Sequence, residues 1–183
     1  VTSANHPVLL RGRHGIGKSS VVYQYATSVG LPVVERRASQ MTEGDLLGLP
    51  KVDDDVTSFC PPDWFATACS TAVLLFLDEV DRATLEVRQG IFELCDSRKL
   101  AGHTLHPETL IFAAVNGGTH AGAAAYQVGE MDPAELDRYT VFDVEPSIDD
   151  WVAWAQTNCE ALVVDFIRNN TEHLEHNDDP EPN

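Results

Sequence analysis

The sequence predicts an α/β fold in which a parallel five-stranded sheet is flanked by helices. Two runs, 72–77 and 110–115, are continuously apolar, as strands buried on both faces of a parallel sheet are. Segments with helical periodicity alternate with strand-like runs, which is typical of right-handed βαβ units. A glycine-rich motif joins the first strand-like run to the first helix, and such sheets bind ligands at the carboxyl ends of their strands.

The elements of the first half follow in order. After a strand at 7–10, a helix is expected from about Gly17 to a stop at Gly30, because one helical face carries four apolar side chains, Val21, Val22, Tyr25 and Val29. A second strand is expected at 31–34. Residues 38–59 are irregular in pattern, with an acidic turn at 53–55, and two prolines at 61–62 favour the start of a helix through Ala68.

The second half continues the alternation. The strand 72–77 precedes a helix whose apolar face carries Val87, Ile91, Leu94 and Cys95. A small hairpin is expected at 99–105, then the strand 110–115, a short helix at 132–137 and a fifth strand at 141–144. Two helices follow, the first with Trp151, Trp154 and Ala155 on one face and the second with Leu162, Val163, Phe166 and Ile167. These patterns predict an α/β domain at 1–146, a helical segment at 147–176 and an acidic, disordered tail at 177–183.

Composition limits the partners. The 183 residues suit one ordinary domain, and no apolar run approaches the ~20 residues that span a bilayer. The chain has 12 Lys and Arg against 29 Asp and Glu, a net charge of −17, which should repel nucleic acid and anionic membranes. The charge is consistent with plain solubility, with a basic protein partner or with a salty cytoplasm. Four cysteines without a C-x-x-C pair indicate free thiols and a cytoplasmic location.

The run Gly12–Ser19 matches the pattern G-x-x-x-x-G-K-[ST] at every required position. Its glycines let successive N–H groups form an anion nest, to which the following helix adds its dipole. Lys18 is expected to reach the β- and γ-phosphates of ATP, and Ser19 to ligate Mg²⁺. The expected nucleotide contacts are Gly12, Arg13, His14, Gly15, Ile16, Gly17, Lys18, Ser19 and Ser20.

Two strand ends carry further chemistry. Asp78 and Glu79 follow the apolar run 73–77, so Asp78 can hold Mg²⁺ and Glu79 can polarise a water for attack on the γ-phosphate. The alternative is a solvated strand end. Asn116 ends the next buried strand, where a neutral amide can contact both the water and the γ-phosphate, unless it only forms a turn before two glycines.

Arg138 follows the short helix 132–137, and a fixed arginine at a domain edge can reach into a neighbour's nucleotide site. The alternative is a surface ion pair with Asp137 or Glu135. His103 and His106 are spaced as a ligand pair but have no matching second pair, so no metal beyond Mg²⁺ is expected.

These residues together resemble the AAA+ ATPases, and within them the MoxR-like branch of bacteria, archaea and phages, over roughly residues 7–166. Four stretches look like that family's Walker A, Walker B, sensor 1 and D-R-F segments: Gly12–Ser19, Leu74–Glu79, Asn116 and Asp137–Tyr139. Residues 37–40 (R-A-S-Q) and 45–50 (D-L-L-G-L-P) resemble MoxR-like sequences more specifically. Residues 78–83 are similar to D-E-I-N-R-A, with Asp81 in place of the asparagine, and 61–64 and 149–155 resemble phage-type members.

The resemblance implies an Mg²⁺-dependent ATPase that hydrolyses ATP between the subunits of a hexameric ring, with Arg138 acting in trans. Such proteins remodel or activate a protein client, often with a von Willebrand factor A-domain adaptor, and the lid and the hairpin around Gly102 would move during hydrolysis. It also implies that 1–146 is the nucleotide-binding domain and 147–176 the start of a helical lid, and it suggests a phage or prophage origin.

Two departures leave alternatives open. The family's P-P-G is Arg13-His14-Gly15 here, and no sensor-2 arginine follows before Asn183, so we expect either a truncated chain or an unusually short lid. A nucleotide-gated, non-hydrolysing scaffold and a small P-loop kinase therefore remain as alternatives. A GTPase is disfavoured because the sequence after the fourth strand lacks N-K-x-D.

Overall fold

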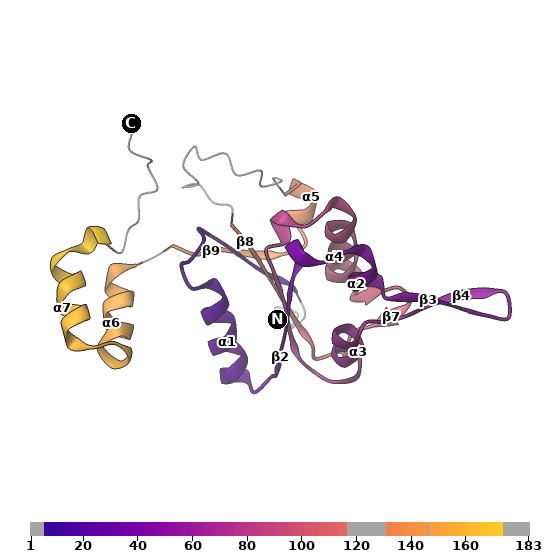
Figure 1. The fold of residues 1–183 in the computed structure, drawn as a ribbon, viewed down its shortest axis with the longest axis horizontal. Coiled ribbons are helices and arrows are strands. Elements are labelled where there is room, and N and C mark those ends of the chain that lie inside the picture. Colours follow the sequence, from indigo (N-terminus) through magenta and orange to yellow (C-terminus); the bar gives the residue numbers. More distant parts are fainter. Residues whose placement is uncertain (1–5, 117–130, 146, 174–183) are drawn as a thin grey trace. The chain divides into compact units, whose positions relative to one another are not determined.

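The computed structural model describes residues 6–116, 131–145 and 147–173. A parallel sheet with strand order β2-β5-β8-β1-β9 lies at the centre of its larger unit (Figure 1). Every neighbouring pair in this sheet is parallel, which confirms the predicted fold class. The strands are β1 (Val8–Arg11), β2 (Val33–Arg37), β5 (Leu74–Asp78), β8 (Leu110–Val115) and β9 (Thr140–Asp143).

Helices cover both faces of this sheet. The connections contain α1 (Lys18–Val29), α2 (Glu43–Leu47), α3 (Asp63–Ser70), α4 (Leu85–Ser97) and α5 (Pro133–Leu136). Short 3₁₀ turns are η1 (Ala38–Gln40) and η2 (Val80–Arg82). Helix α1 lies on one face, and α2, α3 and α4 lie on the other (Figure 1).

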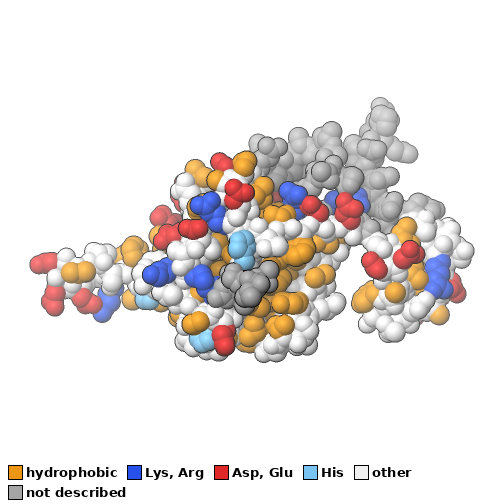
Figure 2. All heavy atoms as spheres, turned by 180° about the vertical axis from the view of Figure 1, so that it is seen from behind, with side chains coloured by type: hydrophobic (Ala, Val, Ile, Leu, Met, Phe, Trp, Pro, Cys, Tyr) orange, Lys and Arg blue, Asp and Glu red, His pale blue; other side chains and the backbone are white. Residues whose placement is uncertain are grey.

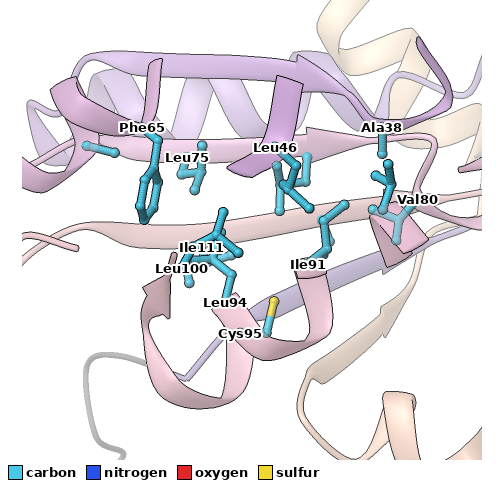
Figure 3. Packing of buried hydrophobic residues seen from close by; sticks show 14 of the residues in the cluster. Ala38, Leu46, Phe65, Leu75, Val80, Ile91, Leu94, Cys95, Leu100 and Ile111 are labelled. Atoms are coloured by element: carbon cyan, nitrogen blue, oxygen red, sulfur yellow. The ribbon is translucent and has the colours of Figure 1, made fainter. Parts of the chain in front are cut away.

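Two apolar clusters hold the helices to the sheet, and β5 contributes to both. Leu74 and Phe76 pack with Val22 and Ala26 of α1. Leu75 and Leu77 belong to the larger cluster on the opposite face, with side chains from α2, α3 and α4 (Figure 3). Because successive strand residues point to opposite faces, a strand covered on both sides must be apolar throughout. This is why the run 72–77 is continuous rather than alternating.

The predicted apolar face of α1 is correct for Val22 and wrong for the other three residues. The buried residues are Lys18, Val22 and Ala26, whereas Val21 is 48% exposed, and Tyr25 and Val29 are 43% exposed. These buried positions recur every four residues, so the phase of the helix is the one that turns Lys18 inward. The helix itself ends as predicted, with Gly30 in the left-handed region at φ 71°.

The second strand begins later than predicted, at Val33 rather than residue 31. The N–H of Leu31 closes the helix end by donating to the carbonyl of Ala26 at 3.0 Å. Pro32 has no N–H to donate to a sheet. The carbonyl oxygen of Pro32 accepts the N–H of Leu74 at 2.8 Å, and the strand begins at the next residue, Val33.

Residues 38–59 are more ordered than their pattern suggests. Thr42 and Asp45 form a capping box at the start of α2. Strands β3 (Leu49–Asp53) and β4 (Val56–Cys60) then form an antiparallel hairpin that projects from the sheet unit (Figure 1). The expected acidic turn lies at its tip, where acidic side chains gather (Figure 2). Asp54 and Asp55 have φ values of 43° and 64°, so this turn forms without glycine, the usual signal for such a hairpin.

The smaller predicted hairpin is confirmed as β6 (Lys99–Leu100) and β7 (His103–Thr104). Leu100 is fully buried, and the His103 ring nitrogen Nε2 lies 3.0 Å from the carbonyl oxygen of Phe59. This contact joins the small hairpin to the base of the long one.

A second compact unit begins at Glu145 and contains α6 (Ile148–Asn158), α7 (Ala161–Asn169) and η3 (Thr171–His173). The Ser147 hydroxyl caps α6 by accepting the N–H of Asp150 at 3.2 Å. Ala155 and Val164 are its buried residues, while Leu162 is 79% exposed. The expected tail at 177–183 lies outside the described residues. Within the described parts of the chain, no helix has the length and apolar character needed to cross a membrane.

We predict that Cys95 resists alkylation in the folded protein while the exposed Cys60 reacts. The Cys95 thiol donates to the Tyr139 hydroxyl at 3.2 Å, and burial raises the pKa of Cys95 to about 12. Because the thiolate is the nucleophile, the buried, protonated Cys95 is protected at pH 8. Iodoacetamide labelling with mass spectrometry checks this, and both cysteines should react in guanidinium. Equal labelling rates in the folded state would contradict it.

Candidate functional site

The loop between β1 and α1 depends on three glycines for two different reasons. Gly15 and Gly17 have φ values of 80° and 91°, a left-handed conformation that other residues adopt only with strain. Gly12 is buried because the chain passes close by: a Cβ there would lie 2.4 Å from the Val144 carbonyl oxygen and 2.6 Å from Ile16 Cδ1. The loop therefore curls tightly against Val144, the residue that follows β9.

The N-terminus of α1 opens from this loop. Gly17 is the N-cap, so no side chain caps the first N–H groups, and the first turn carries no acidic residue. Such a helix end attracts anions through its free N–H groups and its dipole. The nine expected contact residues, Gly12 to Ser20, form this single junction; Ser19 is half-buried in the first turn, and His14, Gly15 and Ser20 are exposed.

Lys18 is buried, and its ammonium group is fully hydrogen-bonded. Nζ donates to the carbonyl oxygens of Gly12 and Arg13 at 2.9 Å each and to the side-chain oxygen of Asn116 at 3.0 Å. Burial lowers the pKa of Lys18, and the charges of Asp78 and Asp81 oppose that shift. The ammonium group thus links the loop after β1 to the end of β8.

Asp78 and Glu79 lie where β5 ends. Asp78 Oδ1 accepts the N–H of Glu79 at 2.9 Å, while burial raises the pKa of Asp78. Glu79 has φ 55°, so the chain reverses there and continues into η2. Its carboxylate accepts a hydrogen bond from the Ser39 hydroxyl in η1. The Asp78 carboxylate is therefore held by the neighbouring backbone, and the Glu79 carboxylate by a residue 40 positions earlier in the chain.

Asn116 directly follows β8, the strand between β5 and β1 in the sheet. Its N–H donates to Asp81 Oδ2 at 2.9 Å, and Asp81 is only 3% exposed. Because parallel strands end at a common edge, Lys18, Asp78 and Asn116 come together although they are far apart in sequence.

Sequence reasoning missed the contacts of two residues at this edge, Ser39 and Asp81. Both lie in stretches that the sequence singled out, 37–40 and 78–83, but neither stretch reveals which side chain it contacts. The sequence did carry one signal for Asp81, because an aspartate stands there where the MoxR-like pattern D-E-I-N-R-A has asparagine.

Arg138 makes its contacts in a different part of the same unit. Its Nη1 donates to the Ala134 carbonyl at 2.6 Å, its Nε lies 3.5 Å from Asp96 Oδ1, and its guanidinium carbon lies 4.2 Å from the centre of the Phe92 ring. The ion-pair partner is therefore Asp96, not Asp137 or Glu135. Glu135 pairs with Arg88 instead.

The Asp78 carboxylate at the end of β5 and the Ser19 hydroxyl in the first turn of α1 are of the chemical type that binds magnesium. Among the described residues, no group of three or more His, Cys, Asp or Glu side chains could hold a metal ion. Magnesium commonly takes one or two protein oxygen ligands and completes its shell with water and phosphate oxygens. The Asp78 carboxylate and the Ser19 hydroxyl are oxygen ligands of that kind.

We predict that Gly12→Ala destabilises the protein by about 1–3 kcal/mol, because the added methyl group meets a fixed carbonyl. Gly44→Ala is the matched control, since its nearest neighbour would be 3.8 Å from the new Cβ. Urea unfolding of both variants checks the difference. Equal stabilities would show that the loop and Val144 are not in close contact.

Comparison with known proteins agrees with this geometry. Residues 7–139 match the model of the AAA domain, dynein-related subfamily. A candidate ATPase from Cytophaga hutchinsonii is similar in fold, with a TM-score of 0.59 and 15% identity over 84% of this chain and 46% of that one. The Thermotoga maritima RuvB Holliday junction branch migration motor gives a TM-score of 0.53 and 14% identity over 81% of this chain and 41% of its own. The chain thus spans less than half the length of these proteins. It belongs to the dynein-related subfamily of the AAA domain family.

Proposed function

We propose that this protein is an Mg²⁺-dependent ATPase that hydrolyses ATP between the subunits of a hexameric ring and uses that reaction to remodel or activate a protein client. The observation that carries the proposal is the contact of Lys18 with Asn116 at one edge of the sheet, next to the uncapped helix α1, where the charges of Asp78 and Glu79 act on the Lys18 ammonium group. An anion nest, a cation, a candidate base and a polar amide are the groups that phosphoryl transfer to water requires.

The binding roles follow from the contacts. The N–H groups of residues 12–17 and the start of α1 surround the phosphates, and Lys18 exchanges its carbonyl partners for the β- and γ-phosphate oxygens. Ser19 and Asp78 would hold Mg²⁺, which neutralises charge on the phosphates when it is bound. Gly12, Arg13, His14, Gly15, Ile16, Gly17 and Ser20 complete the contacts.

Glu79 is the candidate general base. Its carboxylate accepts the proton of the attacking water, and the Ser39 hydroxyl holds that carboxylate at the end of β5. Asn116 orients the water and contacts the γ-phosphate after Lys18 has released its amide oxygen. The amide is neutral, so it adds no repulsion toward the phosphate.

Arg138 acts in trans. Its own contacts, with Phe92, Asp96 and Ala134, are separate from those of Lys18, and its side chain is 33% exposed. A guanidinium group held at the surface in this way can enter the nucleotide site of a neighbouring subunit and neutralise charge on the transferring phosphoryl group. The MoxR-like D-R-F resemblance at 137–139 supports this role.

The client is a protein rather than a nucleic acid. Although RuvB is described as a Holliday junction motor, the net charge of −17 opposes binding to a phosphate backbone. The long hairpin β3–β4 exposes Leu49, Val52 and Val56, which suits it to contact a client. The hairpin around Gly102 is short, and its Leu100 is buried, so it is less suited to contact a client. The MoxR-like resemblance supports a von Willebrand factor A-domain adaptor and a phage origin, and the free cysteines support a cytoplasmic location.

We predict that Glu79→Gln lowers phosphate release by at least about 100-fold, the usual contribution of a general base, while ATP stays bound. Phosphate release, binding of a fluorescent ATP analogue and light-scattering mass with Mg²⁺-ATP are the measurements. The variant should accumulate rings with trapped ATP, whereas the exposed Glu93→Gln control should behave as wild type.

Other results would favour the alternatives. Binding without turnover by the wild type at any protein concentration would replace the ATPase with a nucleotide-gated scaffold. Turnover by a monomer at a rate per subunit independent of concentration would remove the ring mechanism and favour a small kinase.

We predict that Lys18→Ala and Arg138→Ala are each inactive alone but regain turnover when mixed. In a mixed ring, an intact Lys18 meets an intact Arg138 at some interfaces, about a quarter of them if the two variants assemble at random. Steady-state ATPase assays of equal mixtures test this, with Arg168→Ala as a control for loss of an exposed arginine. Absence of recovery in mixtures that still form rings would contradict action in trans.

A further inference from the structure

We propose that Asp81 is a positioning residue that holds Asn116 in place for ATP hydrolysis. This inference rests on the proposed function. Asp81 takes part in a hydrogen-bonded series: its Oδ2 accepts the N–H of Asn116, whose side-chain oxygen accepts from Lys18. The asparagine that carries the candidate γ-phosphate contact is thus held through its backbone from one side and through its amide from the other.

The position of Asp81 is set by the core. Val80, which precedes it, is 2% exposed and packs in the large apolar cluster (Figure 3). The reversal at Glu79 and the hydrogen bonds from the N–H groups of Arg82 and Ala83 to the carbonyls of Glu79 and Val80 close η2 around it. Asp81 therefore lies on a short, anchored turn rather than on a free loop.

The hydrogen bond replaces a missing strand partner. The pairing of β5 with β8 ends at Leu77 and Ala113, because β5 turns away at the candidate base. Asn116 lies three residues beyond this last pair, so its N–H finds no partner on β5. A backbone N–H buried without a partner costs free energy, and the Asp81 carboxylate provides the acceptor.

The negative charge of Asp81 is buried close to the positive charge of Lys18. Its second oxygen, Oδ1, is buried and has no hydrogen-bond partner among the described residues. Burying a carboxylate in this way is unfavourable unless a nearby cation compensates, and Asp81 is one of the charges that act on the Lys18 ammonium group. When Lys18 turns to the phosphates, Asn116 loses its amide partner but keeps the backbone hydrogen bond to Asp81.

Two substitutions separate the hydrogen bond from the charge. Asp81→Ala removes both, whereas Asp81→Asn keeps an oxygen that can accept the Asn116 N–H. We expect Asp81→Ala to lower kcat for ATP by roughly 10- to 100-fold, the cost of misplacing a catalytic contact, with KM changed less than about threefold. Asp81→Asn should recover most of kcat, and the exposed Asp149→Asn is the control.

The Asn116 backbone amide gives a second readout that does not need turnover. Its ¹H chemical shift in ¹⁵N-edited spectra should move upfield in Asp81→Ala and stay near the wild-type value in Asp81→Asn, while thermal unfolding shows that each variant is folded. Wild-type kcat in Asp81→Ala would overturn the inference and leave the proposed ATPase intact. An unmoved amide in Asp81→Ala would also overturn it. A wild type without turnover would overturn the proposed function, and with it the catalytic role of Asp81, while the amide shift still reports the hydrogen bond.

Discussion

The buried ammonium group of Lys18 is the interaction on which the candidate site depends. A charge that is removed from water must be hydrogen-bonded, and Lys18 finds its three acceptors on two separate segments, the loop after β1 and the residue after β8. The loop can offer two carbonyl oxygens only because its glycines allow it to curl back. The same inward turn of Lys18 sets the phase of α1, and hence which of its side chains reach the sheet.

The strand order converts this local arrangement into a site. β8 lies between β1 and β5, so the loop after β1, the carboxylates after β5 and the amide after β8 meet at one edge. β5 can occupy its central position because its residues pack alternately into the two apolar clusters. Asp78 is the last residue of β5. The position of its carboxylate at the candidate site therefore depends on the apolar packing that holds β5 from both faces.

Polar groups at this edge are held by neighbours that take no part in the proposed reaction. Ser39 holds the carboxylate of Glu79, and Asp81 holds the backbone of Asn116. Arg138 is held in the same way at another part of the unit by Phe92 and Asp96. These partners come from three elements, η1, η2 and α4, so the geometry of the candidate groups depends on the whole sheet unit being folded.

The sequence by itself determined the fold class, a strand within 72–77, the strand at 110–115, the helix with Val87, Ile91 and Leu94 on its buried face, and the phosphate-loop motif, because each leaves a strong local pattern. The long hairpin escaped prediction because its turn contains no glycine and its strands are exposed. Only the tertiary structure decided the buried face of α1 and the contacts of Ser39, Asp81 and Asp96. The physical reason is that these contacts join residues 35 or more positions apart, as the Asp81–Asn116 and Ser39–Glu79 pairs do. Such contacts form only when the sheet brings its strand ends together.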